Sequence, residues 1–280
     1  MAPSPLVRLA ARIAATGAPL CVGIDPVPER LPAGVPRTAD GVAQWGIGIV
    51  GAVASHAAAI KLNLAFYEAL GADGWHALEQ IRSAVPSELL VIADAKRGDI
   101  GTTAERYAVA LLDRLGADAV TLSPFLGEDA IEPFLSRGDQ LVYVLTRTSN
   151  PSAGRLQSLR LQDGGTLSEA VAAWAAERWP DGRVGLVVGA TEPAELASLR
   201  AVAPGSGFLV PGIGAQGGDL DAALASVHGA KAPGLITASR SIAEASFADD
   251  WAEAARDAAR ALVDRMADAG ATLGHLPRST

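Results

Sequence analysis

The chain has 280 residues, which fits one large α/β domain or two smaller ones, and its 49% hydrophobic and 19% charged residues argue against global disorder. The formal net charge is −8, and no basic stretch is longer than two residues. This argues against a nucleic-acid partner, because such binding rests on a concentrated Lys/Arg surface, whereas a small anion needs only a local positive pocket.

Cysteine content and hydropathy indicate the compartment. Cys21 is the single cysteine, so an internal disulfide and a Cys-x-x-Cys metal site are excluded, and a reducing cytoplasm is expected. The N-terminal segment lacks the continuous apolar region of a signal peptide. The uncharged segment Gly41–Ile60 carries Val42, Trp45 and Ile49 at helical spacing, which predicts a buried amphipathic helix and no membrane anchor.

Eight short apolar runs, rich in β-branched residues, alternate with segments of helical periodicity. The predicted strands are Leu20–Asp25, Ala59–Asn63, Leu89–Asp94, Ala119–Ser123, Leu141–Thr146, Val184–Gly189, Phe208–Gly212 and Leu235–Ser239. The helical segments include Thr103–Leu115, Leu167–Trp179 and Pro193–Val202. Eight strands, each followed by a helix, in roughly 250 residues are typical of a parallel (β/α)8 TIM barrel. We therefore expect one domain over residues 1–280, in which residues 147–165 form an active-site loop, such as a lid.

Polar residues follow most of the predicted strands. In a barrel of this kind the chemistry lies at the carboxyl ends of the strands. The residues found there are Asp25, Lys61 with Asn63, Asp94 with Lys96, Ser123, Ser149, Gly212 and Arg240. Because charges beside apolar strands are costly unless paired, Asp25, Lys61, Asp94 and Lys96 are expected to meet and neutralise one another. Ser123 is equally well explained as a strand-end turn.

The densest charged segment follows the third strand. Asp94 and Lys96 are two residues apart and so face the same side of a strand, and Asp99 follows where a helix begins near residues 102–103. Asp99 could simply cap that helix in a solvated loop. Lys61 on the preceding strand favours a functional Lys–Asp–Lys–Asp array instead. Such an array keeps each group charged, so that a lysine can protonate a developing carbanion beside a fixed carboxylate.

The run Asp94-Ala-Lys-Arg-Gly-Asp-Ile100 resembles the Asp-x-Lys-x-x-Asp signature of orotidine 5′-phosphate decarboxylases, in its bacterial Asp-x-Lys-Arg-Gly-Asp-Ile form. Further segments resemble the same family in the same order: Cys21–Pro26, Lys61–Ala69, Thr146–Pro151, Pro211–Asp219 and Ser239–Ile242. The resemblance covers all eight strands. It implies conversion of orotidine 5′-phosphate to UMP in de novo pyrimidine biosynthesis, without metal or other cofactor, by a cytoplasmic homodimer with shared active sites.

The resemblance also implies roles for individual residues. Asp94 would lie against the substrate carboxylate, and Lys96 would protonate carbon 6 after decarboxylation. Lys61 would bind the ribose and hold Asp94, while Asp99 would complete the array in the neighbouring subunit's site, together with Thr103. Two further substrate-binding residues are implied, Asp25 for a ribose hydroxyl and Ser149 for the pyrimidine ring.

The phosphate is expected at the loops after the seventh and eighth strands, where barrel enzymes commonly bind it. Gly212 and Gly214 lie in the first loop, where glycines let backbone N–H groups approach an anion and the next helix adds its dipole. Arg240 lies in the second and can bind a phosphate with two hydrogen bonds. The resemblance implies that Gln216 and Arg240 would hold the phosphate.

Three other functions are consistent with parts of this sequence. Gly212-x-Gly-x-x-Gly217 also fits the dinucleotide fingerprint, but that motif belongs after a first strand, with an acidic residue ending the next. A magnesium-dependent sugar-phosphate decarboxylase or aldolase of the same barrel group shares the Asp-x-Lys-x-x-Asp run. It places an acidic metal ligand where this chain has Lys61, a cation that would repel Mg²⁺. A non-catalytic nucleotide-binding barrel would not need Lys96. Roles for Arg155 and Arg160 in phosphate binding stay open.

Overall fold

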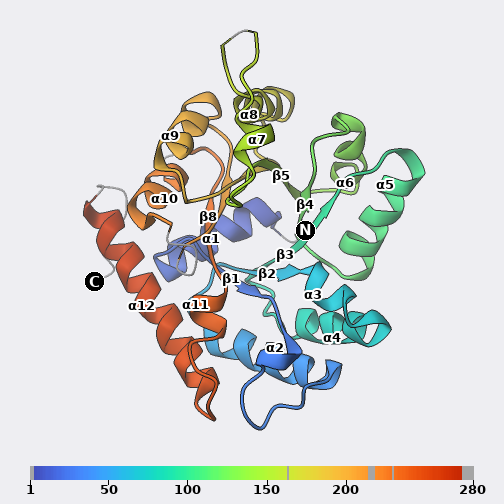
Figure 1. Cartoon of the computed structure of the whole chain (residues 1–280), viewed down its shortest axis with the longest axis vertical. Coiled ribbons are helices and arrows are strands. Elements are labelled where there is room, and N and C mark those ends of the chain that lie inside the picture. The colour runs from blue at the N-terminus through green and yellow to red at the C-terminus, as the bar shows by residue number, and fades with distance from the viewer. Residues whose placement is uncertain (1–2, 163, 214–217, 229, 273–280) are drawn as a thin grey trace.

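The strands close into a barrel. A computed structural model describes residues 3–162, 164–213, 218–228 and 230–272. All its strand pairs are parallel, each strand pairs with the next along the chain, and β8 returns to β1 (Figure 1). The strands are β1 Leu20–Ile24, β2 Ala59–Asn63, β3 Leu90–Arg97, β4 Ala119–Leu122, β5 Leu141–Arg147, β6 Val184–Val188, β7 Phe208–Pro211 and β8 Leu235–Ala238. The predicted (β/α)8 barrel is confirmed, and the main difference in bounds is that β3 continues to Arg97.

Helices surround the barrel as an outer layer (Figure 1). The α-helices are α1 Pro5–Thr16, α2 Ala39–Val53, α3 Leu64–Glu68, α4 Gly71–Ala84, α5 Gly101–Ala108, α6 Glu132–Leu135, α7 Gly154–Gln157, α8 Leu167–Arg178, α9 Pro193–Val202, α10 Leu220–Val227, α11 Arg240–Ala243 and α12 Trp251–Thr272. A π-helical turn, Val109–Arg114, extends α5, so the three segments predicted as helical are helical.

Alternate residues of the strands pack in two layers. Ile92, Tyr143 and Leu209 belong to a cluster inside the barrel, whereas Val91 and Val144 pack outward with the helices. Strands buried on both faces need apolar residues at nearly every position, which is why they read as continuous apolar runs. The inner layer forms an apolar floor beneath the polar side chains at the carboxyl ends of the strands.

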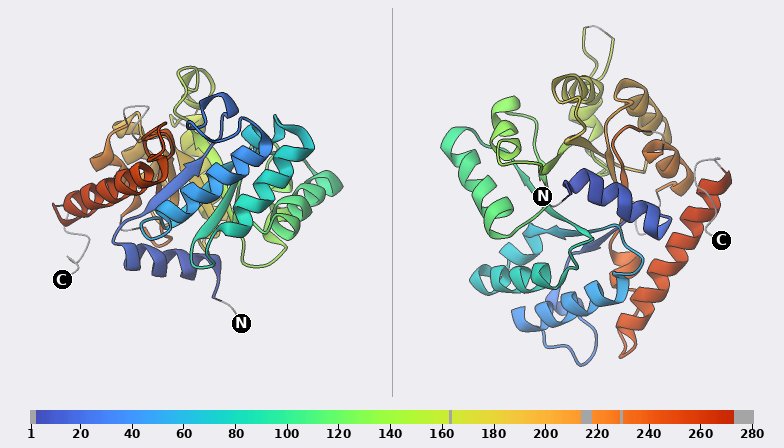
Figure 2. Two further views of the ribbon diagram at one scale, coloured as in Figure 1. Left: turned by 90° about the horizontal axis from the view of Figure 1, so that it is seen from below. Right: turned by 180° about the vertical axis from the view of Figure 1, so that it is seen from behind.

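Helix α1 closes the opposite end of the barrel (Figure 2). Its Leu9 is fully buried in the inner cluster, and Arg12 donates a hydrogen bond of 3.0 Å to the carbonyl of Ala57, just before β2. The Ser4 hydroxyl caps its first turn and Gly17, at φ 72°, ends it. This helix was not predicted from the sequence, although a serine cap before proline and a terminal glycine are its usual signals.

Two further predictions concern single segments. Gly41–Ile60 forms most of α2 and the start of β2, both packed in the fold, as expected. Over the described ranges, no helix is both long and apolar enough to cross a bilayer. Residues 147–165 are only partly irregular, because α7 and a bridge between Arg160 and Thr166 organise them. That this loop acts as a lid stays a prediction.

Candidate active site

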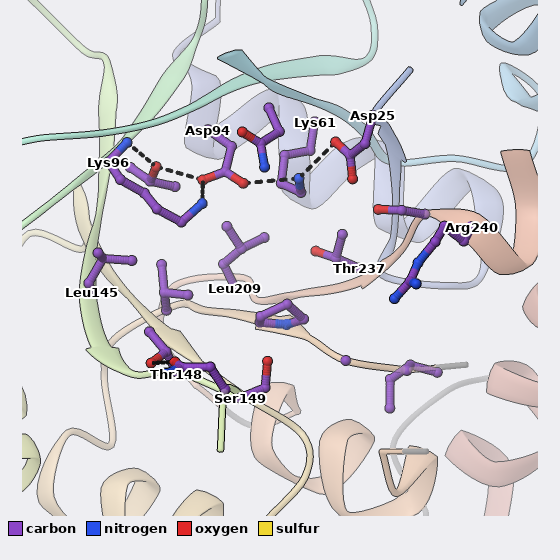
Figure 3. Close-up of a pocket in the computed structure, with 18 of the residues that line it drawn as sticks. Asp25, Lys61, Asp94, Lys96, Leu145, Thr148, Ser149, Leu209, Thr237 and Arg240 are labelled. Carbon is purple, nitrogen blue, oxygen red and sulfur yellow. Dashed lines mark hydrogen bonds and ion pairs between the residues drawn. The ribbon is translucent and has the colours of Figure 1, made fainter. Parts of the chain in front are cut away.

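A cavity of about 440 Å³ opens at the carboxyl ends of the strands. Every strand, or the loop directly after it, contributes to its lining. Figure 3 shows Lys96, Asp94, Lys61 and Asp25 in a row along one wall, with Arg240 beyond the Asp25 end of the row. The cavity brings together seven of the residues proposed from the sequence: Asp25, Lys61, Asp94, Lys96, Ser149, Gly212 and Arg240.

Asp94 lies at the centre of the charged row and is only 8% exposed. Its Oδ1 accepts hydrogen bonds from Lys96 Nζ at 2.6 Å and Thr121 Oγ1 at 2.8 Å, and its Oδ2 accepts one from Lys61 Nζ at 3.1 Å. Burial alone would raise the pKa of Asp94, but the two ammonium groups and these hydrogen bonds outweigh it and hold the pKa well below its ordinary value. Asp94 is therefore ionised at neutral pH.

Lys61 is a buried ammonium between two carboxylates. Its Nζ lies 3.6 Å from Asp25 Oδ1 and 3.1 Å from Asp94 Oδ2. Burial lowers the pKa of Lys61, but Asp25 and Asp94 together raise it by more, so the pKa lies above its ordinary value. This fixed cation opposes binding of a divalent metal ion to the same two carboxylates, because like charges repel strongly at such distances.

Lys96 reaches the cavity through an irregular turn. The register between β3 and β4 shifts here, so that residues 94–96 lie opposite Thr121 alone. Lys96 has φ 47°, and among the described residues no other non-glycine residue has a positive φ. The prediction that Asp94 and Lys96 share one face is confirmed, but a bulge, and not the regular pleat, brings the two side chains together.

Ser149 lies across the cavity from Asp94 (Figure 3). It is packed against Gly189, directly after β6, where an added Cβ atom would lie 3.0 Å from the Ser149 backbone nitrogen. The neighbouring Thr148 N–H donates a 2.8 Å hydrogen bond to the Gln157 side chain of α7. Close backbone packing and this contact therefore fix the part of the loop that carries Ser149.

The residues at the predicted phosphate end of the cavity make fewer contacts with the rest of the described chain. Arg240 lines the cavity and is exposed, and its guanidinium makes no hydrogen bond or ion pair with the rest of the described chain. Gly212 also lines the cavity, with φ 108°, and its carbonyl accepts a 3.0 Å hydrogen bond from Gly218. Gly214 and Gln216, which the sequence analysis assigned to this end, lie outside the described residues.

Asp99 and Thr103 do not line the cavity of their own chain. Asp99 Oδ1 accepts a 2.9 Å hydrogen bond from the next residue, Ile100, and Thr103 is exposed on α5. Helix α5 has no side-chain cap, so the alternative in which Asp99 caps it was wrong. Their roles stay predictions. Ser123, whose N–H donates to the Arg97 carbonyl at 2.7 Å, lies outside the lining, in agreement with a strand-end turn.

Comparison with known proteins identifies the family of this chain. The family model described as "Orotidine 5'-phosphate decarboxylase / HUMPS family" matches residues 18–258. The chain belongs to this family. A relative from Herpetosiphon aurantiacus, named orotidine 5′-phosphate decarboxylase, is 46% identical over 87% of this chain and 91% of its own length. One from Roseiflexus castenholzii, with the same name, is 49% identical over 88% and 91%.

Solved structures support the same family. The OMP decarboxylase of Leishmania donovani superimposes with a TM-score of 0.84 and 39% identity, over 95% of this chain and 98% of that one. The UMP synthase of Leishmania donovani gives a TM-score of 0.85 and 41% identity, but the match covers only 56% of that longer chain. The predicted family resemblance is thus confirmed over nearly the whole barrel.

Two buried polar residues that line the cavity were not predicted from the sequence. Thr121 and Thr237 lie on β4 and β8, are 1% and 4% exposed, and line the cavity. A polar residue within an otherwise apolar strand was the available signal. Threonine is also a common strand former, however, so its presence alone does not distinguish a site residue from a structural one.

Proposed function

We propose that this chain decarboxylates orotidine 5′-phosphate to UMP in pyrimidine biosynthesis, as the names of its relatives indicate. The observation that carries the proposal is the hydrogen-bonded Lys61–Asp94–Lys96 group, in which Lys61 and Asp94 are buried. The same cavity is lined by Arg240, whose side chain has no hydrogen bond or ion pair to a described residue. A substrate with a carboxylate on its ring and a phosphate at its other end matches this distribution of charge. The relatives in Herpetosiphon and Roseiflexus carry the name of this activity.

In the proposed reaction, the ionised Asp94 lies beside the carboxylate of the substrate. The bond from carbon 6 to that carboxylate breaks, carbon dioxide leaves, and the electron pair stays on carbon 6. The Lys96 ammonium then gives a proton to carbon 6 and regains one from solvent. The depressed pKa of Asp94 supports this scheme, because the carboxylate is already ionised in the free enzyme.

The remaining contacts follow the length of the nucleotide. Asp25 and Lys61 would bind the ribose hydroxyls, and Ser149 the pyrimidine ring. The phosphate would be held by Gly212, Gly214, Gln216 and Arg240, and the loop 147–165 would close over the substrate. Support comes from the positions of Asp25 and Ser149 in the cavity lining.

The proposal includes a cytoplasmic homodimer with shared sites. Asp99 and Thr103 would enter the cavity of the neighbouring subunit. This would explain why neither residue lines the cavity of its own subunit. Three large apolar side chains nearby support an interface: Ile100 is 53%, Phe125 80% and Leu126 47% exposed. A reducing compartment suits the single buried Cys21, which is free.

An absorbance assay for loss of orotidine 5′-phosphate, with and without EDTA, tests the function. We expect turnover at the same rate in both conditions, since the Lys61 ammonium lies between the two carboxylates. Turnover of any kind removes the non-catalytic nucleotide-binding alternative. Loss of activity in EDTA that Mg²⁺ restores would favour the magnesium-dependent alternative. A folded enzyme without turnover in either condition would contradict the proposal.

A further inference from the structure

The bulge at residues 94–96 removes backbone groups from the sheet, and side chains satisfy them instead. The Lys96 N–H donates a hydrogen bond of 3.0 Å to Thr121 Oγ1. The Ala95 carbonyl accepts one of 3.0 Å from Arg97 Nη1. Because backbone groups that leave a ladder need another partner, these two bonds are what permit the bulge.

The direction of the Thr121 hydroxyl follows from its contacts. Oγ1 accepts from the Lys96 N–H and has one proton to donate, and the Asp94 Oδ1 atom lies 2.8 Å away. Thr121 is 1% exposed, so water does not compete for that proton. The hydroxyl of Thr121 thus links the backbone of Lys96 to the side chain of Asp94.

We propose that Thr121 is a positioning residue, whose hydroxyl holds the Lys96 backbone and the Asp94 carboxylate in their working arrangement. This inference rests on the proposed function. A left-handed backbone is unfavourable for a lysine and persists only where its surroundings enforce it. Without the hydroxyl, the turn at Lys96 can relax and the ammonium can leave the Asp94 oxygen, 2.6 Å away.

The effect should fall on the chemical step. Arg240 and Ser149 lie away from Asp94 and Lys96 on the cavity wall (Figure 3), and neither side chain forms a hydrogen bond with Thr121. Substrate and product affinity should therefore change little, whereas proton delivery by Lys96 should suffer. A side chain with only a structural role would instead lower stability without changing turnover per folded site.

Thr146 provides a matched control on the next strand. It is 3% exposed, its hydroxyl donates to the Val144 carbonyl at 3.0 Å, and it does not line the cavity. Thr146→Val removes an equally buried hydroxyl with no link to Asp94 or Lys96. The comparison separates loss of any buried hydroxyl from loss of this one.

The experiment compares Thr121→Val, Thr121→Ser and Thr146→Val with the wild type. We measure kcat and KM for orotidine 5′-phosphate, the Kd for UMP and the thermal unfolding of each. For Thr121→Val we expect kcat to fall at least ~30-fold, with KM and Kd within ~3-fold of the wild type. Thr121→Ser, which keeps the hydroxyl, and Thr146→Val should both stay within ~3-fold in kcat.

Several outcomes overturn the inference. They are a kcat for Thr121→Val within ~3-fold of the wild type, an equal loss in Thr121→Ser, or a change confined to KM. If Thr121→Val does not unfold cooperatively, Thr121→Ala takes its place against Thr121→Ser. Wild-type protein without turnover removes the proposed function and this inference together. An active wild type with an unaffected Thr121→Val removes this inference alone.

Discussion

The two ends of the cavity differ in how far the chain satisfies its own charges. At one end, Asp94 accepts hydrogen bonds from Lys61, Lys96 and Thr121, all within the protein. At the other end, the Arg240 guanidinium has no hydrogen bond or ion pair to any described residue. The first arrangement fixes charges in advance, which lowers the reorganisation needed during reaction. The second leaves a cation for an incoming anion, which is suited to binding.

The local structure follows the same division. Asp94 and Lys96 lie on a bulged strand in the barrel wall, joined to β4 through Thr121. Arg240 begins the short helix α11, and Gly212 lies in a loop with a positive φ. We therefore expect substitutions at the first end to change turnover, and those at the second to change affinity. The predictions below test that division.

The largest effect is expected for Lys96→Ala. Removing the ammonium takes away the proposed proton donor and one partner of Asp94, so kcat should fall by about three decades or more, ~4 kcal/mol in the activation barrier. Thermal unfolding should still be cooperative. The exposed Lys231, before β8, gives the control Lys231→Ala, which should keep normal activity. A Lys96→Ala enzyme with more than about a tenth of wild-type kcat would exclude Lys96 as the donor.

Asp99 does not line the cavity of its own subunit. Mixing two inactive variants tests in which subunit's site it acts. Lys96→Ala and Asp99→Ala subunits are combined under conditions that exchange subunits. In a mixed dimer with shared sites, one of the two sites contains both intact residues, so random mixing should restore about a quarter of wild-type activity. If heterodimers form and no activity returns, Asp99 acts in the site of its own subunit.

Arg240→Ala should act on binding. Loss of a charge-assisted phosphate contact should raise KM for orotidine 5′-phosphate and the Kd for UMP about 100-fold, ~2.7 kcal/mol. Turnover of orotidine, which lacks the phosphate, should hardly change, and that substrate serves as the control. An equal loss with both substrates would mean that Arg240 has another role, and the proposed division of the cavity would fail.

The charged end was largely predictable from sequence. Each strand is buried on both faces, so it is recognisable in the sequence as a short apolar run. A lysine or aspartate at the end of such a run is therefore easy to identify. Lys61 and Asp94 could be placed side by side because consecutive strands of a barrel are neighbours. Arg240 was found by the same argument.

The bulge and Thr121 could not be predicted in the same way. Which residue of β4 faces Asp94 depends on the register between β3 and β4. That register shifts between Ala93 and Arg97, and the shift depends on tertiary contacts that the local sequence does not reveal. The positive φ of Lys96 is likewise set by its surroundings, since lysine does not favour it. Helix α1 is a different case, because its caps were visible in the sequence and only its position beneath the barrel was not.

The smallest effect concerns stability, and it compares Asp94→Asn with Arg240→Ala in urea unfolding across pH. At pH 7 the Asn variant leaves Lys61 with a weaker partner, which should lower the free energy of unfolding by about 2 kcal/mol.

The pH dependence of this difference follows from the pKa of Asp94, which is depressed in the folded protein. The stabilisation by the Asp94 carboxylate is therefore complete above the unfolded pKa of about 4 and is lost as pH falls toward the folded pKa. The difference between wild type and Asp94→Asn should therefore be constant from pH 7 to about pH 4 and narrow below it. Arg240 is exposed and has no ion pair with the residues that the structure describes, so Arg240→Ala should stay within about 0.5 kcal/mol of the wild type throughout. Equal destabilisation by both variants would show that Asp94 and Arg240 contribute equally to the stability of the fold, and the contrast between the two ends of the cavity would fail.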